Sequence, residues 1–116
     1  MVQITIQVPE ELASKIQPLQ NWLPTILELS LVGFKTLATE TATEVIQLFA
    51  ANPSPQQVLD YHVSERAQDR SRRLLALNAV GLLGEEEQRE LDELNKIEHT
   101  MIKLKAQLGK QVQRGA

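Results

Sequence analysis

The chain has no cysteine and few aromatic residues, which make up 3% of its 116 positions. The lack of cysteine excludes a disulfide scaffold, a thiolate metal site and a cysteine nucleophile. Because hydrophobic residues still make up 42%, the core must consist mainly of Leu, Ile, Val and Ala. This composition suits one small domain, or a small domain with an appendage.

A long uncharged hydrophobic run is also missing. The most apolar stretch, residues 23–38, carries Glu28 and Lys35 and is too short and too charged to span a bilayer. The opening Met1-Val2-Gln3 shows neither the basic nor the apolar region of a secretion signal. We therefore expect a cytoplasmic protein with no membrane contact.

No motif for catalysis or metal binding is present. The sequence lacks the His-Glu-x-x-His, Gly-x-Ser-x-Gly, phosphate-loop and dinucleotide patterns. The only histidines, His62 and His99, are far apart, and we expect one at an element boundary and the other on a helix surface. We therefore expect no catalytic residue, no metal site and no cofactor, and a function other than that of an enzyme.

Residues 2–8 alternate between apolar and polar side chains, as in a β-strand with one buried face. The apolar members are Val2, Ile4, Ile6 and Val8, and the polar members are Gln3, Thr5 and Gln7. No second convincing strand follows, and a lone strand leaves its backbone groups unpaired. Pairing with a second copy of the chain about a two-fold axis is the simplest solution. We therefore predict a homodimer, with the four apolar residues in its core.

Two helices are predicted after this strand. A short helix begins after Pro9 and ends near Pro18. A second helix, from Trp22 to Leu37, is apolar on nearly every side, which is typical of an element that is buried all round. A monomer this small can hardly surround such a helix, so we place Ile26 and Leu29 in the dimer core as well.

Cap residues predict where the later helices begin. Thr41 and Glu44 form a capping box for a third helix. Ser54 precedes a proline and predicts a short fourth helix, and Ser64 predicts a fifth that fades near Gly81. The turn around residue 52 divides the chain into a dimerisation unit, 1–52, and a helical hairpin, 53–116.

The last predicted helix, residues 85–113, carries a seam of apolar residues at intervals of three and four. These are Leu91, Leu94, Ile97, Met101, Leu104 and Leu108. The helix would be roughly 43 Å long at 1.5 Å per residue, about twice the length of the preceding helix. The far end of the seam, at Met101, Leu104 and Leu108, therefore needs cover and is a candidate site for a protein partner. Packing within the chain or the dimer explains it equally well.

Charge is unevenly distributed over the chain, whose net charge is −3. Up to position 60 there are two cations and six acids. Three arginines share one face of the fifth helix: Arg66, Arg70 and Arg73. They could contact phosphate, but pairing with Glu65 and Asp69 on a solvated face is the favoured interpretation.

The opening strand, followed by Val8-Pro9-Glu10-Glu11-Leu12 and two helices, resembles the ribbon-helix-helix family. Members are dimeric DNA-binding proteins, many of them antitoxins and autorepressors, in which two strands form a ribbon in the major groove. The resemblance implies base contacts by Gln3, Thr5 and Gln7 and a phosphate contact near residues 22–25. A solvated ribbon face explains the same three polar residues without DNA.

The second half of the chain is similar to a group of small bacterial proteins with the same strand-first layout, a similarity that implies no activity. It rests on Pro53-Ser54-Pro55-Gln56-Gln57 and on the acidic run that begins at Glu85. Together the patterns predict a mainly α-helical homodimer with a ribbon-helix-helix-like N-terminal unit and a C-terminal helical hairpin. We expect a small regulator of antitoxin type that binds operator DNA and a toxin or other protein. The alternative is a structural or adaptor dimer that binds proteins only.

Overall fold

The structure is a computed structural model that describes the backbone of residues 1–115 and the side chains of residues 1–113. Its elements are α1 (Glu10–Ile16), the 3₁₀ helix η1 (Gln17–Leu19), α2 (Leu23–Leu31), α3 (Ala38–Ala50), α4 (Pro55–Leu59), α5 (Glu65–Ala79) and α6 (Glu85–Gly115). The prediction of a mainly helical chain is confirmed. No strand is present among residues 1–115, so the strand predicted at residues 2–8 is not formed in the single chain.

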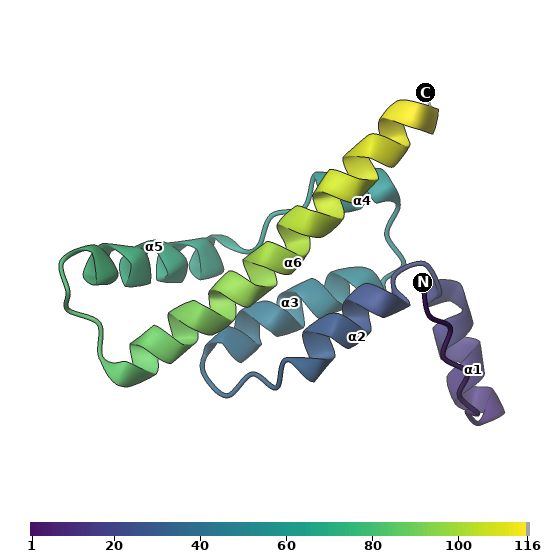
Figure 1. The fold of residues 1–116 in the computed structure, drawn as a ribbon, viewed down its shortest axis with the longest axis horizontal. Coiled ribbons are helices and arrows are strands. Elements are labelled where there is room, and N and C mark those ends of the chain that lie inside the picture. The colour runs from purple at the N-terminus through teal and green to yellow at the C-terminus, as the bar shows by residue number, and fades with distance from the viewer. Residues whose placement is uncertain (116) are drawn as a thin grey trace.

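Helix α6 is the spine of the molecule and packs against α2, α3, α4 and α5 in turn. Figure 1 shows it crossing the other helices diagonally, with α5 folded back beside it at one end and α4 near its other end. Helices α5 and α6 form the predicted hairpin. The proposed division near residue 52 falls in the turn between α3 and α4, and both parts of the chain contribute to one core.

That core is aliphatic around a single aromatic pair. Its buried members are Trp22, Leu29, Ala38, Ala42, Val45, Phe49, Val58, Leu74, Leu91, Leu94, Ile97, Met101 and Leu108. The rings of Trp22 and Phe49 meet at a centroid distance of 5.4 Å, and the indole Nε1–H donates to the Pro53 carbonyl oxygen at 2.9 Å. The indole thus ties α2 to the turn after α3 with its polar atom satisfied.

The hairpin turn between α5 and α6 depends on Gly81. Its φ of +72° lies in the left-handed region that glycine adopts at little cost. The Gly81 amide donates to the Asn78 carbonyl and the Leu82 amide to the Leu77 carbonyl, which is the Schellman arrangement that ends a helix. The sequence correctly predicted the end of α5 here.

Two predictions for the middle of the chain are wrong. The second helix ends at Leu31 rather than Leu37, because Gly33 takes a left-handed φ of +70°. The third helix begins at Ala38, so Thr41 lies inside it and forms no capping box. The Ala38 amide instead donates to Thr36 Oγ1 at 3.1 Å.

The other predicted caps are confirmed. The Ser54 side chain accepts the Gln57 amide, and the Gln57 side chain accepts the Ser54 amide, so α4 begins with a complete capping box. The Ser64 side chain accepts the Ala67 amide at the start of α5.

Candidate interaction surface

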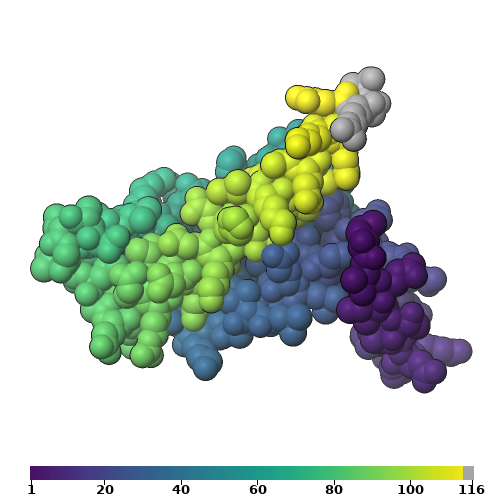
Figure 2. All heavy atoms as spheres, viewed as in Figure 1, coloured from purple at the N-terminus to yellow at the C-terminus, as the bar shows by residue number. Residues whose placement is uncertain are grey.

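The N-terminal arm, residues 1–16, projects from the body of the molecule. Helix α1 has no buried residue, and its main neighbour is the short helix η1. In Figure 2 the arm forms a separate lobe at one side, and in Figure 1 residues 1–9 are a plain trace that leads into α1. The chain alone therefore gives the arm almost no cover.

Apolar side chains of the arm are left in solvent. Val2, Ile4 and Ile6 are 90%, 85% and 69% exposed, and Val8 is only partly buried. Within the described part of the chain, no hydrogen bond joins residues 1–8 to any other residue. The strand predicted here does not form because the single chain offers no segment to complete a ladder with it. Isolated exposed apolar residues are ordinary, but a continuous row of them marks an interaction site.

The polar residues of the same segment are also exposed. Gln3, Thr5 and Gln7 all lie in solvent, so both faces of the segment are accessible. The three residues are neighbours on the same short exposed segment. Their proposed base contacts stay a prediction.

A second exposed apolar surface lies on the outer side of α2. Leu27 and Leu31 are 51% and 82% exposed, whereas Leu29 on the opposite side is fully buried by the chain's own core. Helix α2 is therefore not buried all round in the single chain, and Leu29 needs no second subunit for its cover. The sequence interpretation included Leu27 and Leu31 in this apolar helix but assigned only Ile26 and Leu29 to the dimer core. Ile26 is in fact partly buried against the chain's own core. The signal for all four was the same, an apolar helix with no polar face.

The three residues assigned to a protein partner are core residues of this chain. Met101 and Leu108 are buried, and Leu104 is partly buried against the same cluster. Helix α4 packs against α6, so the far end of the seam is covered from within. The prediction that this end needs another molecule is wrong, because residues 55–59 supply the missing surface.

Two of the three arginines on this face of α5 lie near carboxylates of other helices: Arg66 Nη2 is 3.9 Å from Glu40 Oε2 of α3, and Arg70 pairs with Glu90 of α6. Arg70 makes a bidentate pair with Glu90 of α6, with Nε–Oε2 at 2.8 Å and Nη2–Oε1 at 2.9 Å. The Glu90 side chain is only 4% exposed. The hydrogen bond and the charge of Glu90 raise the pKa of Arg70. The pairing predicted within α5 is thus wrong for Arg70, whose carboxylate partner comes from the other arm of the hairpin.

The part of the sequence that contains the arm has more acids than cations. Up to position 60 there are two cations, Lys15 and Lys35, and six acids. At the start of α2, where the family resemblance implies a phosphate contact, Trp22 and Thr25 are buried and Pro24 has no amide to offer. These charges would therefore contribute little to the affinity of a single chain for a polyanion such as DNA.

A carboxylate of α6 holds the loop between α2 and α3. Glu93 accepts the backbone amides of Lys35 and Thr36 at 3.2 Å and the Thr36 hydroxyl at 2.7 Å. Burial by itself would raise the pKa of Glu93. The hydrogen bonds from Thr36 and Lys35, helped by the charge of Lys96, outweigh it and lower the pKa below its ordinary value of 4.5. No short-range pattern shows this contact, since 57 positions separate Thr36 from Glu93.

This carboxylate predicts an acid-sensitive part of the stability. Because the folded-state pKa is lowered, the contribution is complete above the ordinary pKa of 4.5 and is lost as the pH falls through the folded value. Urea unfolding of the wild type and of Glu93→Gln should therefore differ most near neutral pH, with the difference shrinking below about pH 4. A constant difference across the series would contradict the assigned contact.

His62 and His99 are exposed, at an element boundary and on α6, as predicted. Among residues 1–115 no cluster of three metal-ligating side chains occurs. None of the helices in that range combines the length and apolar character needed to cross a membrane.

Comparison of the chain with protein-family models, with curated proteins and with solved structures finds no match.

Proposed function

We propose that the chain works as a homodimer whose two N-terminal segments, residues 2–8, pair as antiparallel strands. The observation that carries this proposal is the exposed row of Val2, Ile4 and Ile6 on a segment without backbone partners. Antiparallel pairing would join the backbone groups of the two segments. It would also place both apolar rows on one face of the ribbon.

The exposed side of α2 supports the same arrangement. A two-stranded ribbon is marginal by itself and needs an apolar surface to cover its inner face. The outer side of α2 offers Leu27 and Leu31 for that purpose, and α1 adds Leu12, which is 43% exposed. In a two-fold dimer each of these apolar surfaces occurs once in each chain, so a single interface can bury all of them.

We propose further that the dimer is a small regulator of antitoxin type. The outer face of the ribbon would carry Gln3, Thr5 and Gln7 from both chains, and glutamine can pair bidentately with adenine in the major groove. The ribbon dimensions suit that groove. The remaining helices would then be available to a protein partner such as a toxin.

The second candidate is an adaptor dimer without affinity for DNA. The excess of acids over cations up to position 60 favours it, because phosphate neutralisation supplies most of the affinity for nucleic acid. In this case the polar residues on the outer face serve only to keep the ribbon solvated. Both candidates share the dimer, so dimerisation and DNA binding need separate measurements.

The dimer is tested with Ile4→Lys/Ile6→Lys. Light scattering coupled to gel filtration should give twice the 13.0 kDa chain mass for the wild type and the single mass for this variant. The helical circular dichroism signal should be unchanged, since neither residue contributes to the core of the chain. The matched control is Gln3→Lys/Thr5→Lys, with the same charge on the other face, which should stay dimeric. A monomeric wild type would overturn the proposal.

The same proteins decide between regulator and adaptor. Wild-type protein should retard a DNA fragment from upstream of its own gene, with an affinity that falls steeply as salt rises. Gln3→Ala/Gln7→Ala should weaken that complex but leave the dimer intact. If a dimeric wild type shows no retardation at low salt, the adaptor is the correct function.

A further inference from the structure

An apolar groove lies between α5 and α6, well away from the N-terminal arm. Its volume is about 440 Å³. The two helices are joined at the hairpin turn and diverge from it (Figure 1). Its apolar lining includes Val45, Leu75, Leu94, Ile97, Met101 and Ile102.

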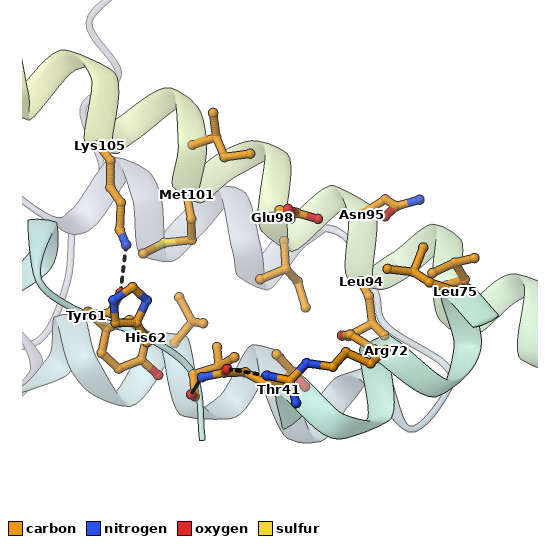
Figure 3. A pocket seen from close by; sticks show the side chains of 17 residues that line it. Thr41, Tyr61, His62, Arg72, Leu75, Leu94, Asn95, Glu98, Met101 and Lys105 are labelled. Atoms are coloured by element: carbon orange, nitrogen blue, oxygen red, sulfur yellow. Dashed lines mark hydrogen bonds between the residues drawn. The ribbon is translucent and has the colours of Figure 1, made fainter. Parts of the chain in front are cut away.

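One end of the groove carries a cation without a carboxylate partner. Lys105 Nζ donates to the Tyr61 carbonyl oxygen at 2.7 Å, and Figure 3 shows its side chain reaching across the end of the groove towards Tyr61 and His62. Lys105 is half-buried, and no acid among the described residues lies within ion-pair distance of it. Its remaining ammonium hydrogens are free to meet an anion.

The other charged groups of the lining differ from Lys105. Arg72 is already engaged by Asp69 at 2.7 Å and by the Gln68 side chain. Glu98 is exposed and adds one negative charge, and His62 is exposed at the Lys105 end. Burial, with a smaller effect of Glu44, raises the pKa of the Tyr61 phenol, which therefore stays uncharged near neutral pH.

We propose that the α5–α6 groove binds a small amphipathic carboxylate, with its alkyl chain on the apolar lining and its carboxylate on Lys105. Binding sites for small molecules are mostly apolar clefts of about 300–1,000 Å³ with a few polar groups that fix the orientation, and this groove fits that description. From Leu91 to Lys105, α6 runs for about 21 Å along the groove, which suits an extended chain.

The test uses dodecanoate as the probe, below its micelle concentration, in calorimetric titrations of the full chain. Dodecyltrimethylammonium, with the same alkyl chain and the opposite charge, is the comparison ligand. Wild-type protein should bind dodecanoate saturably at one site per chain and at least about tenfold more tightly than the ammonium compound. In Lys105→Glu this preference should be reversed.

Two further variants make the result specific. Lys110→Glu makes the same charge change at an exposed position of α6 outside the groove and should bind as the wild type does. Ser71→Trp fills the groove from α5 and should abolish binding of both compounds. Circular dichroism checks that each variant is folded. If Lys105→Glu is not folded, Lys105→Gln replaces it. The Lys105→Gln variant should bind dodecanoate no more tightly than the ammonium compound.

Three outcomes would overturn the proposal. They are the absence of saturable binding in the wild type, an unchanged preference in the Lys105 variant, and an equal loss in Lys110→Glu. The first would leave the groove to a protein segment rather than a small molecule. None of these outcomes bears on the dimer, whose proposed interface lies on the arm and on the outer side of α2.

Discussion

Replacing Leu29 by aspartate is expected to leave the chain unfolded in water. The Leu29 side chain is 0% exposed and belongs to the same core cluster as Trp22 and Phe49. Removal of a large aliphatic side chain from a core costs about 2–5 kcal/mol, and an unpaired buried charge adds several more. The free energy of unfolding of small domains is only about 5–15 kcal/mol. This single change therefore removes most or all of the stability of the fold.

The control lies two residues further along the same helix. Both variants are made in the monomeric Ile4→Lys/Ile6→Lys background, because Leu31 belongs to the proposed dimer interface. Leu31→Asp introduces the same charge where the side chain is 82% exposed, and its unfolding free energy should stay within about 0.5 kcal/mol of that background. Circular dichroism and the fluorescence of Trp22, the only tryptophan of the chain, report on both variants. A cooperative unfolding transition with native ellipticity in Leu29→Asp would show that the core has been misassigned.

The positions of most helices could be predicted because their signals are local. Ser54 and Ser64 are recognisable caps, Pro18 limits the first helix, and Gly81 ends α5 through its left-handed backbone. Gly33 offers the same kind of signal, but the apolar run that continues past it to Leu37 concealed the end of α2. The left-handed backbone at Gly33, and not the apolar pattern, determines where α2 ends.

The surface that covers an apolar stripe could not be predicted from the stripe. The seam at Met101, Leu104 and Leu108 indicates burial, but it does not distinguish a partner protein from α4 of the same chain. The arm presents the opposite case, because Ile4 and Ile6 remain exposed. The periodicity of the sequence predicts which side chains need to be buried. The tertiary arrangement determines which segment or which other molecule buries them.

Polar contacts between residues far apart in the sequence could not be predicted either. Glu93 caps a loop more than fifty positions away, and Glu90 pairs with Arg70 across the hairpin, 20 positions apart. Both carboxylates belong to a helix rich in Glu, and nothing in their own neighbourhood sets them apart from Glu86 or Glu98. The tertiary arrangement selects them, because the hairpin brings Arg70 to Glu90 and the packing of the loop between α2 and α3 on α6 brings Thr36 to Glu93.

The Arg70–Glu90 pair predicts an asymmetric response to removing either partner. The Glu90 side chain is 4% exposed and that of Arg70 is 36% exposed. Arg70→Ala leaves a buried carboxylate without its counter-ion, which should cost about 3 kcal/mol. Glu90→Ala leaves a guanidinium that water still reaches in part, so its cost should be smaller, about 1–2 kcal/mol.

Urea unfolding followed by Trp22 fluorescence at neutral pH measures both costs. The double variant Arg70→Ala/Glu90→Ala should be more stable than Arg70→Ala alone, because removal of the buried carboxylate relieves the desolvation that the single variant suffers. Arg72→Ala is the matched control, since its partner Asp69 lies on the same helix and both side chains are about two-thirds exposed, so its loss should cost less than about 1 kcal/mol. If Glu90→Ala proved more damaging than Arg70→Ala, the carboxylate would have to be solvated in the folded protein. The α5–α6 junction would then be held by apolar contacts at Leu74 rather than by the ion pair.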